Sequence, residues 1–216
     1  QWRAVHAEVG RVDALVGMPS DITLEIYDLG VDLNLAADDG TVVDFAGNQA
    51  LDVVAGTGKT VTLDHDGARG ELLRATAAAR LGVAGYFYAD GSLAIERSFA
   101  DVQLAGGGDT VATQVLTIGG GNLNAFVGIN GPYRQDSDGD GDIDAQDAVN
   151  PDAVGLSATQ VDFGLALFAE QGGSREWTSL RATAGEVALV GLADLSASAS
   201  NVNIGLNLVK GVATDA

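Results

Sequence analysis

Apolar and polar residues alternate over most of the chain. Ile22, Leu24 and Ile26 are separated by polar residues, and similar spacing recurs in residues 31–35, 111–118, 161–168 and 202–208. A period of two is typical of β-strands with one buried face. Gly, Asn and Asp separate these stretches, and proline is rare, as paired strands require. The pattern predicts an all-β protein with about ten or more strands and few helices.

Two segments have helical character, and for the first of them the choice between helix and strand stays open. Residues 71–81 read ELLRATAAARL and are good helix formers. They also resemble LRATAGE, residues 180–186, and this resemblance favours a strand. Residues 144–149 are compatible with one short helical turn, which Asn150-Pro151 would end.

The beginning and the end of the chain resemble each other. Residues 10–35 and 185–208 both contain A-L-V-G and both end in L-N-L, and a tryptophan precedes each of them, Trp2 and Trp177. The period, counted from Gly10 to Gly185, is about 175 residues. We therefore predict that residues 1–216 are a single β-rich repeat domain, excised from a tandem array.

Two architectures suit an all-β repeat, because both manage exposed strand edges. One is a repetitive β-solenoid, or β-helix-like stack, in which each repeat caps the next. The alternative is a series of antiparallel β-sandwich repeats. Small residues at positions expected to face inward, Ala182, Ala184, Ser196 and Ser198, favour the narrow packing of a solenoid.

The charge of the chain limits its partners. Lys and Arg total 11 against 30 Asp and Glu, which gives a net charge of −19. Such a surface repels nucleic acid and anionic membranes. No run of 18 apolar residues is present, so we expect no membrane insertion. The absence of cysteine excludes disulfides and thiolate metal sites.

One acidic stretch has the spacing of an EF-hand-type calcium loop. Residues 136–147 read DSDGDGDIDAQD, with carboxylates at positions 1, 3, 5, 9 and 12. Calcium takes 6–8 oxygen ligands, and alternate residues of a tightly wound loop can supply them. The predicted ligands of a Ca²⁺ cofactor are Asp136, Asp138, Asp140, Asp144 and Asp147, with Asp142 binding through its main-chain carbonyl.

Other positions of this loop support the same interpretation. Gly141, at position 6, allows the sharp turn, and Ile143, at position 8, is expected to turn inward and tie the loop to a core. One position departs from the pattern, because position 12 is Asp147 where calmodulin-like loops have glutamate. The shorter side chain can bind the ion with both oxygens only if the loop tightens. Magnesium is a weaker competitor because it prefers strict octahedral geometry.

Motifs for catalysis are weak, and we predict that the protein is not an enzyme. Residues 55–60, AGTGKT, resemble a phosphate-binding loop, but Val53 stands where that motif needs glycine, so a hairpin turn is expected. His6 and His65 have no evident nucleophile nearby in the sequence. Trp2, Trp177 and residues 86–88 are candidates for a sugar-stacking platform, although such aromatics more often fill a core.

Residues 131–168, followed by residues 177–191, resemble the repeats of very large, secreted, calcium-dependent (RTX-adhesin-like) bacterial surface proteins. The resemblance implies an extracellular location at the bacterial cell surface and a structural role in an adhesin or filament that Ca²⁺ rigidifies. The implied partners are neighbouring repeats of the same protein or identical subunits. The chain lacks the nonapeptide array of RTX proteins. A module that binds glycans or another cell surface is the alternative.

Overall fold

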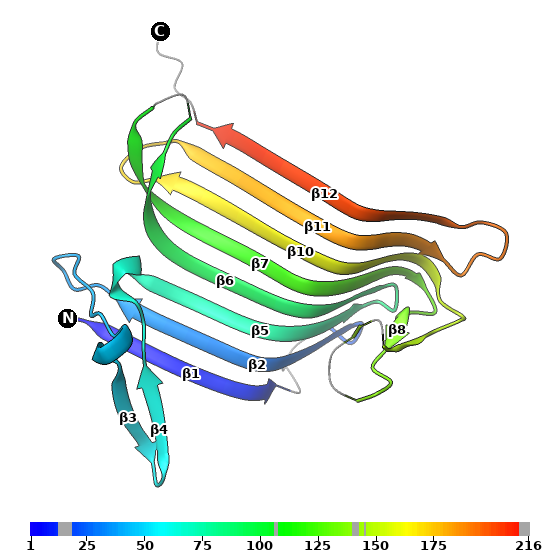
Figure 1. The fold of residues 1–216 in the computed structure, drawn as a ribbon, viewed down its shortest axis with the longest axis horizontal. Coiled ribbons are helices and arrows are strands. Elements are labelled where there is room, and N and C mark those ends of the chain that lie inside the picture. The colour runs from blue at the N-terminus through cyan, green and yellow to red at the C-terminus, as the bar shows by residue number, and fades with distance from the viewer. Residues whose placement is uncertain (13–18, 106–107, 140–142, 145, 212–216) are drawn as a thin grey trace.

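The computed structural model describes residues 1–12, 19–105, 108–139, 143–144 and 146–211. These residues form strands and two single-turn 3-10 helices, and none of them lies in an α-helix (Figure 1). No helix among the described residues is long and apolar enough to span a membrane. The strands are β1 (Arg3–Val12), β2 (Ile22–Leu35), β3 (Leu51–Gly56), β4 (Lys59–Leu63), β5 (Leu72–Val83), β6 (Phe87–Gln103), β7 (Thr110–Ile129), β8 (Arg134–Gln135), β9 (Ala148–Val149), β10 (Val154–Glu170), β11 (Glu176–Val190) and β12 (Ala197–Lys210). The 3-10 turns are η1 (Gly47–Gln49) and η2 (Gly67–Arg69).

Eight long strands form one antiparallel sheet in the order β1-β2-β5-β6-β7-β10-β11-β12. The prediction of an all-β chain is therefore confirmed. The predicted solenoid is not what the described residues form, because each long strand turns back on the preceding one instead of stacking as the next rung. Ser196 and Ser198, which were expected to face inward, are exposed. The antiparallel pairing matches the alternative architecture instead.

The individual strand predictions hold. The alternating residues 22–26 and 31–35 both lie in β2, and the other three stretches lie in β7, β10 and β12. Residues 72–81, for which helix and strand were both open, lie in β5, because β2 and β6 pair with both edges of that strand. The phosphate-loop-like motif is a turn between β3 and β4, where Gly58 has a φ of +70°.

A line of unusual backbone conformations crosses the sheet near its middle. Asp28, Asn122, Gln160 and Asn201 have φ values of 48°, 49°, 51° and 54°, one each in β2, β7, β10 and β12. Residues in this left-handed region add one residue to a strand and bend it. Figure 1 shows that the long strands all bend near their middle. The bend therefore belongs to the whole sheet.

One face of the sheet, here called the covered face, packs against two connecting segments. Residues 36–71, between β2 and β5, cover one end of it, and the described part of residues 130–153, between β7 and β10, covers the other. The Asn34 side-chain amide donates to the Val43 carbonyl at 2.9 Å. These segments contribute the buried apolar side chains Phe45, Leu63, Ile143 and Ala153, and the strands contribute Leu72, Val111, Val115, Phe126 and Ala184.

The opposite face, here called the open face, is apolar. The strand pairing places every second residue of each strand on this face. Many of the apolar side chains on it are 41–55 % exposed. They include Val5, Val9, Leu73, Leu93, Ile95, Val127, Ile129, Leu156, Ile204, Leu206 and Leu208. Such alternation is the pattern of one layer of an antiparallel sandwich.

Candidate metal centre

The acidic loop lies in the second covering segment, and a small hairpin closes its ends. Arg134 pairs with Val149 and Gln135 with Ala148, which joins β8 to β9. The Asp147 N–H reaches the Asp144 carbonyl at 3.4 Å, but a strand follows instead of the short helical turn considered from the sequence. The loop thus has the spacing of an EF-hand without the flanking helices, because β9 returns to pair with β8.

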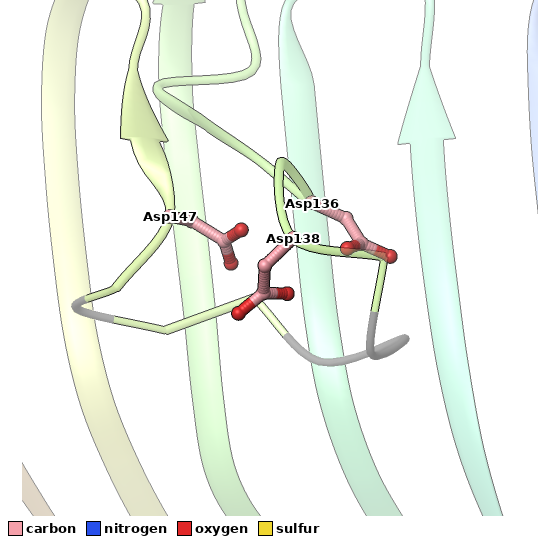
Figure 2. Close-up of side chains that lie close together, drawn as sticks. All are labelled: Asp136, Asp138 and Asp147. Atoms are coloured by element: carbon pink, nitrogen blue, oxygen red, sulfur yellow. The ribbon is translucent and has the colours of Figure 1, made fainter.

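Three predicted ligands come together in this loop. Carboxylate oxygens of Asp136, Asp138 and Asp147 all lie within 4.8 Å of one another (Figure 2). These residues occupy positions 1, 3 and 12 of the loop. Asp144 does not join this group, and its Oδ1 accepts from the Gln146 N–H at 2.8 Å. The remaining predicted ligands, Asp140 and Asp142, and the turn glycine Gly141 lie outside the described residues.

Asp147 is the buried member of the group, with 4 % of its surface exposed. Its Oδ1 accepts from the Ser137 N–H at 2.7 Å, and its Oδ2 accepts from the Asp144 N–H at 2.9 Å. These backbone donors, Ser137 first, lower the pKa of the Asp147 carboxyl, so the group is held as a carboxylate. Oδ1 also accepts from the Ser137 hydroxyl at 3.3 Å, so Oδ2 is the oxygen that retains a second lone pair to face a cation.

Asp136 connects the loop to the sheet. Its Oδ1 accepts from the Gly139 N–H at 2.8 Å, across a turn in which Gly139 has a φ of +78°. Its Oδ2 lies 3.7 Å from the Arg80 guanidinium on β5. Arg80 also pairs with Asp90 at 3.0 Å and lies 3.8 Å from Glu25. One arginine thus faces several carboxylates, including one of the candidate ligands.

The loop rests on the covered face. Ile143 is buried, which confirms the prediction that it turns inward, and its carbonyl accepts a hydrogen bond from the Asn124 side-chain amide on β7. The Arg134 guanidinium donates to the Asp147 carbonyl at 2.8 Å. Beside Ile143, a cavity of about 290 Å³ separates part of the segment from the sheet, and the rings of Tyr88, Phe126 and Tyr133 line it. The loop is therefore anchored at both ends and near its centre.

This arrangement suits a hard cation. Three carboxylates at short range repel one another, and an opposite charge between them removes that repulsion. Calcium accepts carboxylate oxygens and backbone carbonyls in flexible geometry, and both are present along this loop. Arg80 neutralises only part of the charge, because Asp90 and Glu25 also face it.

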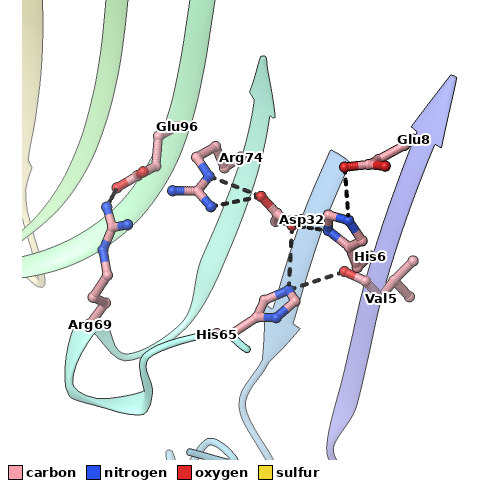
Figure 3. A network of polar contacts seen from close by, with 8 residues as sticks. All are labelled: Val5, His6, Glu8, Asp32, His65, Arg69, Arg74 and Glu96. Atoms are coloured by element: carbon pink, nitrogen blue, oxygen red, sulfur yellow. Dashed lines mark hydrogen bonds and ion pairs between the residues drawn. The ribbon is translucent and has the colours of Figure 1, made fainter. Parts of the chain in front are cut away.

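A second polar cluster, which the sequence did not predict, joins the first covering segment to the sheet (Figure 3). Asp32 Oδ1 lies 2.7 Å from His6 Nδ1, and Asp32 Oδ2 accepts from the Arg74 guanidinium at 2.8 Å. His65 Nε2 lies 3.1 Å from the Val5 carbonyl and 3.8 Å from Asp32. The hydrogen bond to Asp32 raises the pKa of His6. These contacts join β1, β2 and β5 to the covering segment.

The aromatic residues considered as a sugar platform do not lie together. Trp2 lies beside the end of β2, because the next residue, Arg3, pairs with Leu35. Tyr86 lies beyond Val83, which pairs with Ile22 at the start of β2. Trp177 is on β11, and five strands lie between β11 and β1. The Arg175 guanidinium lies 5.5 Å from the Trp177 ring. A single stacking surface is therefore not formed.

Comparison with known proteins gave no matching family model, no matching curated protein and no matching solved structure.

Proposed function

We propose that this chain is a structural repeat of an extracellular adhesin or cell-surface filament, and that Ca²⁺ rigidifies it at residues 136–147. The observation that carries the proposal is the group formed by Asp136, Asp138 and Asp147. Positions 1, 3 and 12 of a calcium-loop sequence meet at one point, on a loop whose ends are closed by a hairpin.

The mechanism is coupled ordering of the loop and the sheet. Asp136, Asp138 and Asp147 would hold the ion with their side chains, and the sequence adds Asp140, Asp144 and the Asp142 carbonyl. Binding removes the repulsion among the carboxylates and tightens the loop over Ile143. Extracellular modules bind calcium with a Kd of about 10⁻⁴–10⁻³ M, so millimolar calcium adds about 0.5–1.5 kcal/mol of stability.

The setting proposed for this role is the outside of a bacterial cell. Calcium there is plentiful enough to fill a site of modest affinity. The net charge of −19 suits cation binding and repels nucleic acid. The role is non-catalytic, and its partners are neighbouring repeats or identical subunits. A glycan-binding role receives less support, because the aromatic side chains considered for it lie at separate places on the sheet.

The test compares thermal unfolding in millimolar Ca²⁺ and in excess chelator for three proteins. They are the unchanged chain, Asp138→Asn, which alters an exposed ligand, and Asp194→Asn, which removes an exposed charge between β11 and β12. We expect Ca²⁺ to raise the Tm of the unchanged chain by about 2–5 °C. Asp194→Asn should retain the whole increase, and Asp138→Asn should lose most of it.

Two results would count against the proposal. Equal melting of the unchanged chain in Ca²⁺ and in chelator would make the loop an acidic turn without a metal. An equal loss of the calcium response in both variants would show that Ca²⁺ screens the overall charge instead of binding at this loop. Isothermal titration of the unchanged chain gives the stoichiometry, which should be one ion bound at the loop.

A further inference from the structure

The β1–β2 and β11–β12 hairpins are two copies of one structural unit. The residue three positions after Trp2 faces Leu33, the first leucine of the first L-N-L motif. The residue three positions after Trp177 faces Leu206, the first leucine of the second. The tryptophan lies near the start of the first strand of each hairpin, and the L-N-L motif lies near the end of the second strand. Strand pairing gives these two features the same relative position in both hairpins.

The bend in the sheet supports this equivalence independently. Asp28, with a φ of 48°, lies five residues before Leu33, and Asn201, with a φ of 54°, lies five residues before Leu206. A glycine occupies the position opposite each of them, Gly10 on β1 and Gly185 on β11. β12 is therefore the equivalent of β2 in backbone conformation as well as in sequence.

The two equivalent strands have different neighbours. β2 lies between β1 and β5, whereas β12 pairs with β11 on one side only. The other side of β12 corresponds to the side of β2 that binds β5. Among the residues that the structure describes, nothing pairs with that side.

The free edge of β12 also lacks the features that usually prevent strand addition. Residues 197–209 contain no charge and no proline, and 13 of the 14 residues of β12 are exposed. Natural edge strands are usually protected by charges, proline or a covering segment. The other edge, β1, has four ionisable side chains, and His65 lies 3.1 Å from its Val5 carbonyl. Of the two edges that the described residues give the eight-stranded sheet, the β12 edge is thus the one suited to receive another strand.

We propose that this edge binds, by β-strand addition, a strand with the sequence of β5 from a second copy of the same repeat, in which the β11–β12 hairpin takes the place of that copy's own β1–β2 hairpin and leaves one edge of the strand free. This deepens the proposed structural role and rests on it for its biological setting, but the pairing itself needs no metal. In β2, Val31 faces Ala75, and Ile26 faces Ala79. The equivalent positions in β12 are Ile204 and Ala199, so the register of the added strand is fixed.

Main-chain hydrogen bonds and the apolar open face carry this interaction. Ile204 and Leu206 would offer the added strand the same apolar side-chain positions that Val31 and Leu33 offer β5 in the first hairpin. The ion pair between Arg74 and Asp32 would not be repeated, because glycine occupies the equivalent position of β12. Recognition therefore depends on register and shape rather than on charge.

The test uses disulfide trapping, because the chain has no cysteine of its own. Ile204→Cys and Ala199→Cys are made separately in the full chain. Each variant is mixed, in chelator, with a peptide of residues 72–83 that carries either Ala75→Cys or Ala79→Cys. Facing residues of an antiparallel pair lie within disulfide range, whereas four residues along a strand span about 13 Å.

The matched pairs are Ile204→Cys with Ala75→Cys and Ala199→Cys with Ala79→Cys. We expect them to form disulfides at least about tenfold faster than the two mismatched pairs, whose sulfurs are too far apart. Equal rates for all four pairs, or no peptide adduct at all, would overturn the proposal. So would disulfide-linked protein dimers that form in preference to peptide adducts, since β12 would then pair with another β12. Chelator is present throughout, so the absence of a peptide adduct counts against strand addition alone. The absence of a calcium response in the melting experiment counts against the proposed function alone.

Discussion

We expect Asp147 to stabilise the fold in two ways, through its hydrogen bonds to backbone N–H groups and as a proposed Ca²⁺ ligand, and one pair of variants separates the two. Its carboxylate accepts the Ser137 and Asp144 N–H groups at 2.7 and 2.9 Å, and the residue is only 4 % exposed. Hydrogen bonds to charged groups contribute about 1.5–3 kcal/mol each, and water can reach part of this loop. Asp147→Ala should therefore reduce the free energy of unfolding by about 2–4 kcal/mol even without calcium.

Asp138→Asn is the matched comparison, because Asp138 is exposed and belongs to the same carboxylate group. In chelator its free energy of unfolding should stay within about 0.5 kcal/mol of the unchanged chain. Asp147→Ala should melt about 5–10 °C lower under the same conditions. In Ca²⁺ both variants should lack most of the increase in Tm that we expect for the unchanged chain.

Urea unfolding in chelator, followed by tryptophan fluorescence and circular dichroism, measures the contribution of the backbone hydrogen bonds to Asp147. The same titration in millimolar Ca²⁺ measures the contribution of Asp147 as a ligand. If Asp147→Ala is as stable as the unchanged chain in chelator, the two backbone hydrogen bonds do not organise the loop, and the reasoning fails. If Asp147→Ala retains the calcium response, Asp147 is not a ligand.

Two further predictions concern the sheet. Gly155→Ala should lower the free energy of unfolding by about 2 kcal/mol or more, because a Cβ there would lie 2.2 Å from the Val127 carbonyl oxygen. Gly164→Ala, on the same strand with no atom within 4 Å, should change it by no more than about 0.5 kcal/mol in urea titrations, and equal losses would refute the steric argument. The hydrogen bond to Asp32 raises the pKa of His6, so its contribution is complete below pH 6.5 and is lost as pH rises through the raised value. Thermal melts should show this decline in the unchanged chain and a flatter profile in His6→Gln, whereas parallel profiles would contradict it.

Local features of the chain were predictable because their causes are local. Alternation locates the strands, and Ile143 is buried because it is the one large apolar residue within an acidic loop. Carboxylate oxygens at positions 1, 3 and 12 of the calcium-loop spacing lie within 4.8 Å of one another. Residues 71–81 stayed ambiguous, because alanine-rich sequences favour a helix until neighbouring strands pair with both edges.

Features that depend on pairing between distant segments were not predictable. Solenoid rungs and sheet strands share the same alternation, so periodicity could not separate them. His6 and Asp32 meet because β1 and β2 pair, and nothing in the sequence identifies them as partners. Gln160 adopts a left-handed backbone that its residue type does not favour, because the neighbouring strands bend at the same level.

The strand order also determines how the fold responds to mechanical load. The start of β1 and the end of β12 lie at the same end of the strands but at opposite edges of the sheet (Figure 1). A pull between Arg3 and Lys210 therefore acts across the strands and opens neighbouring hydrogen bonds one after another, as in a zipper, instead of shearing them together. Each strand peeled from an edge releases about 3.3–3.6 Å per residue. The sheet should therefore yield at low force and extend in steps of single strands.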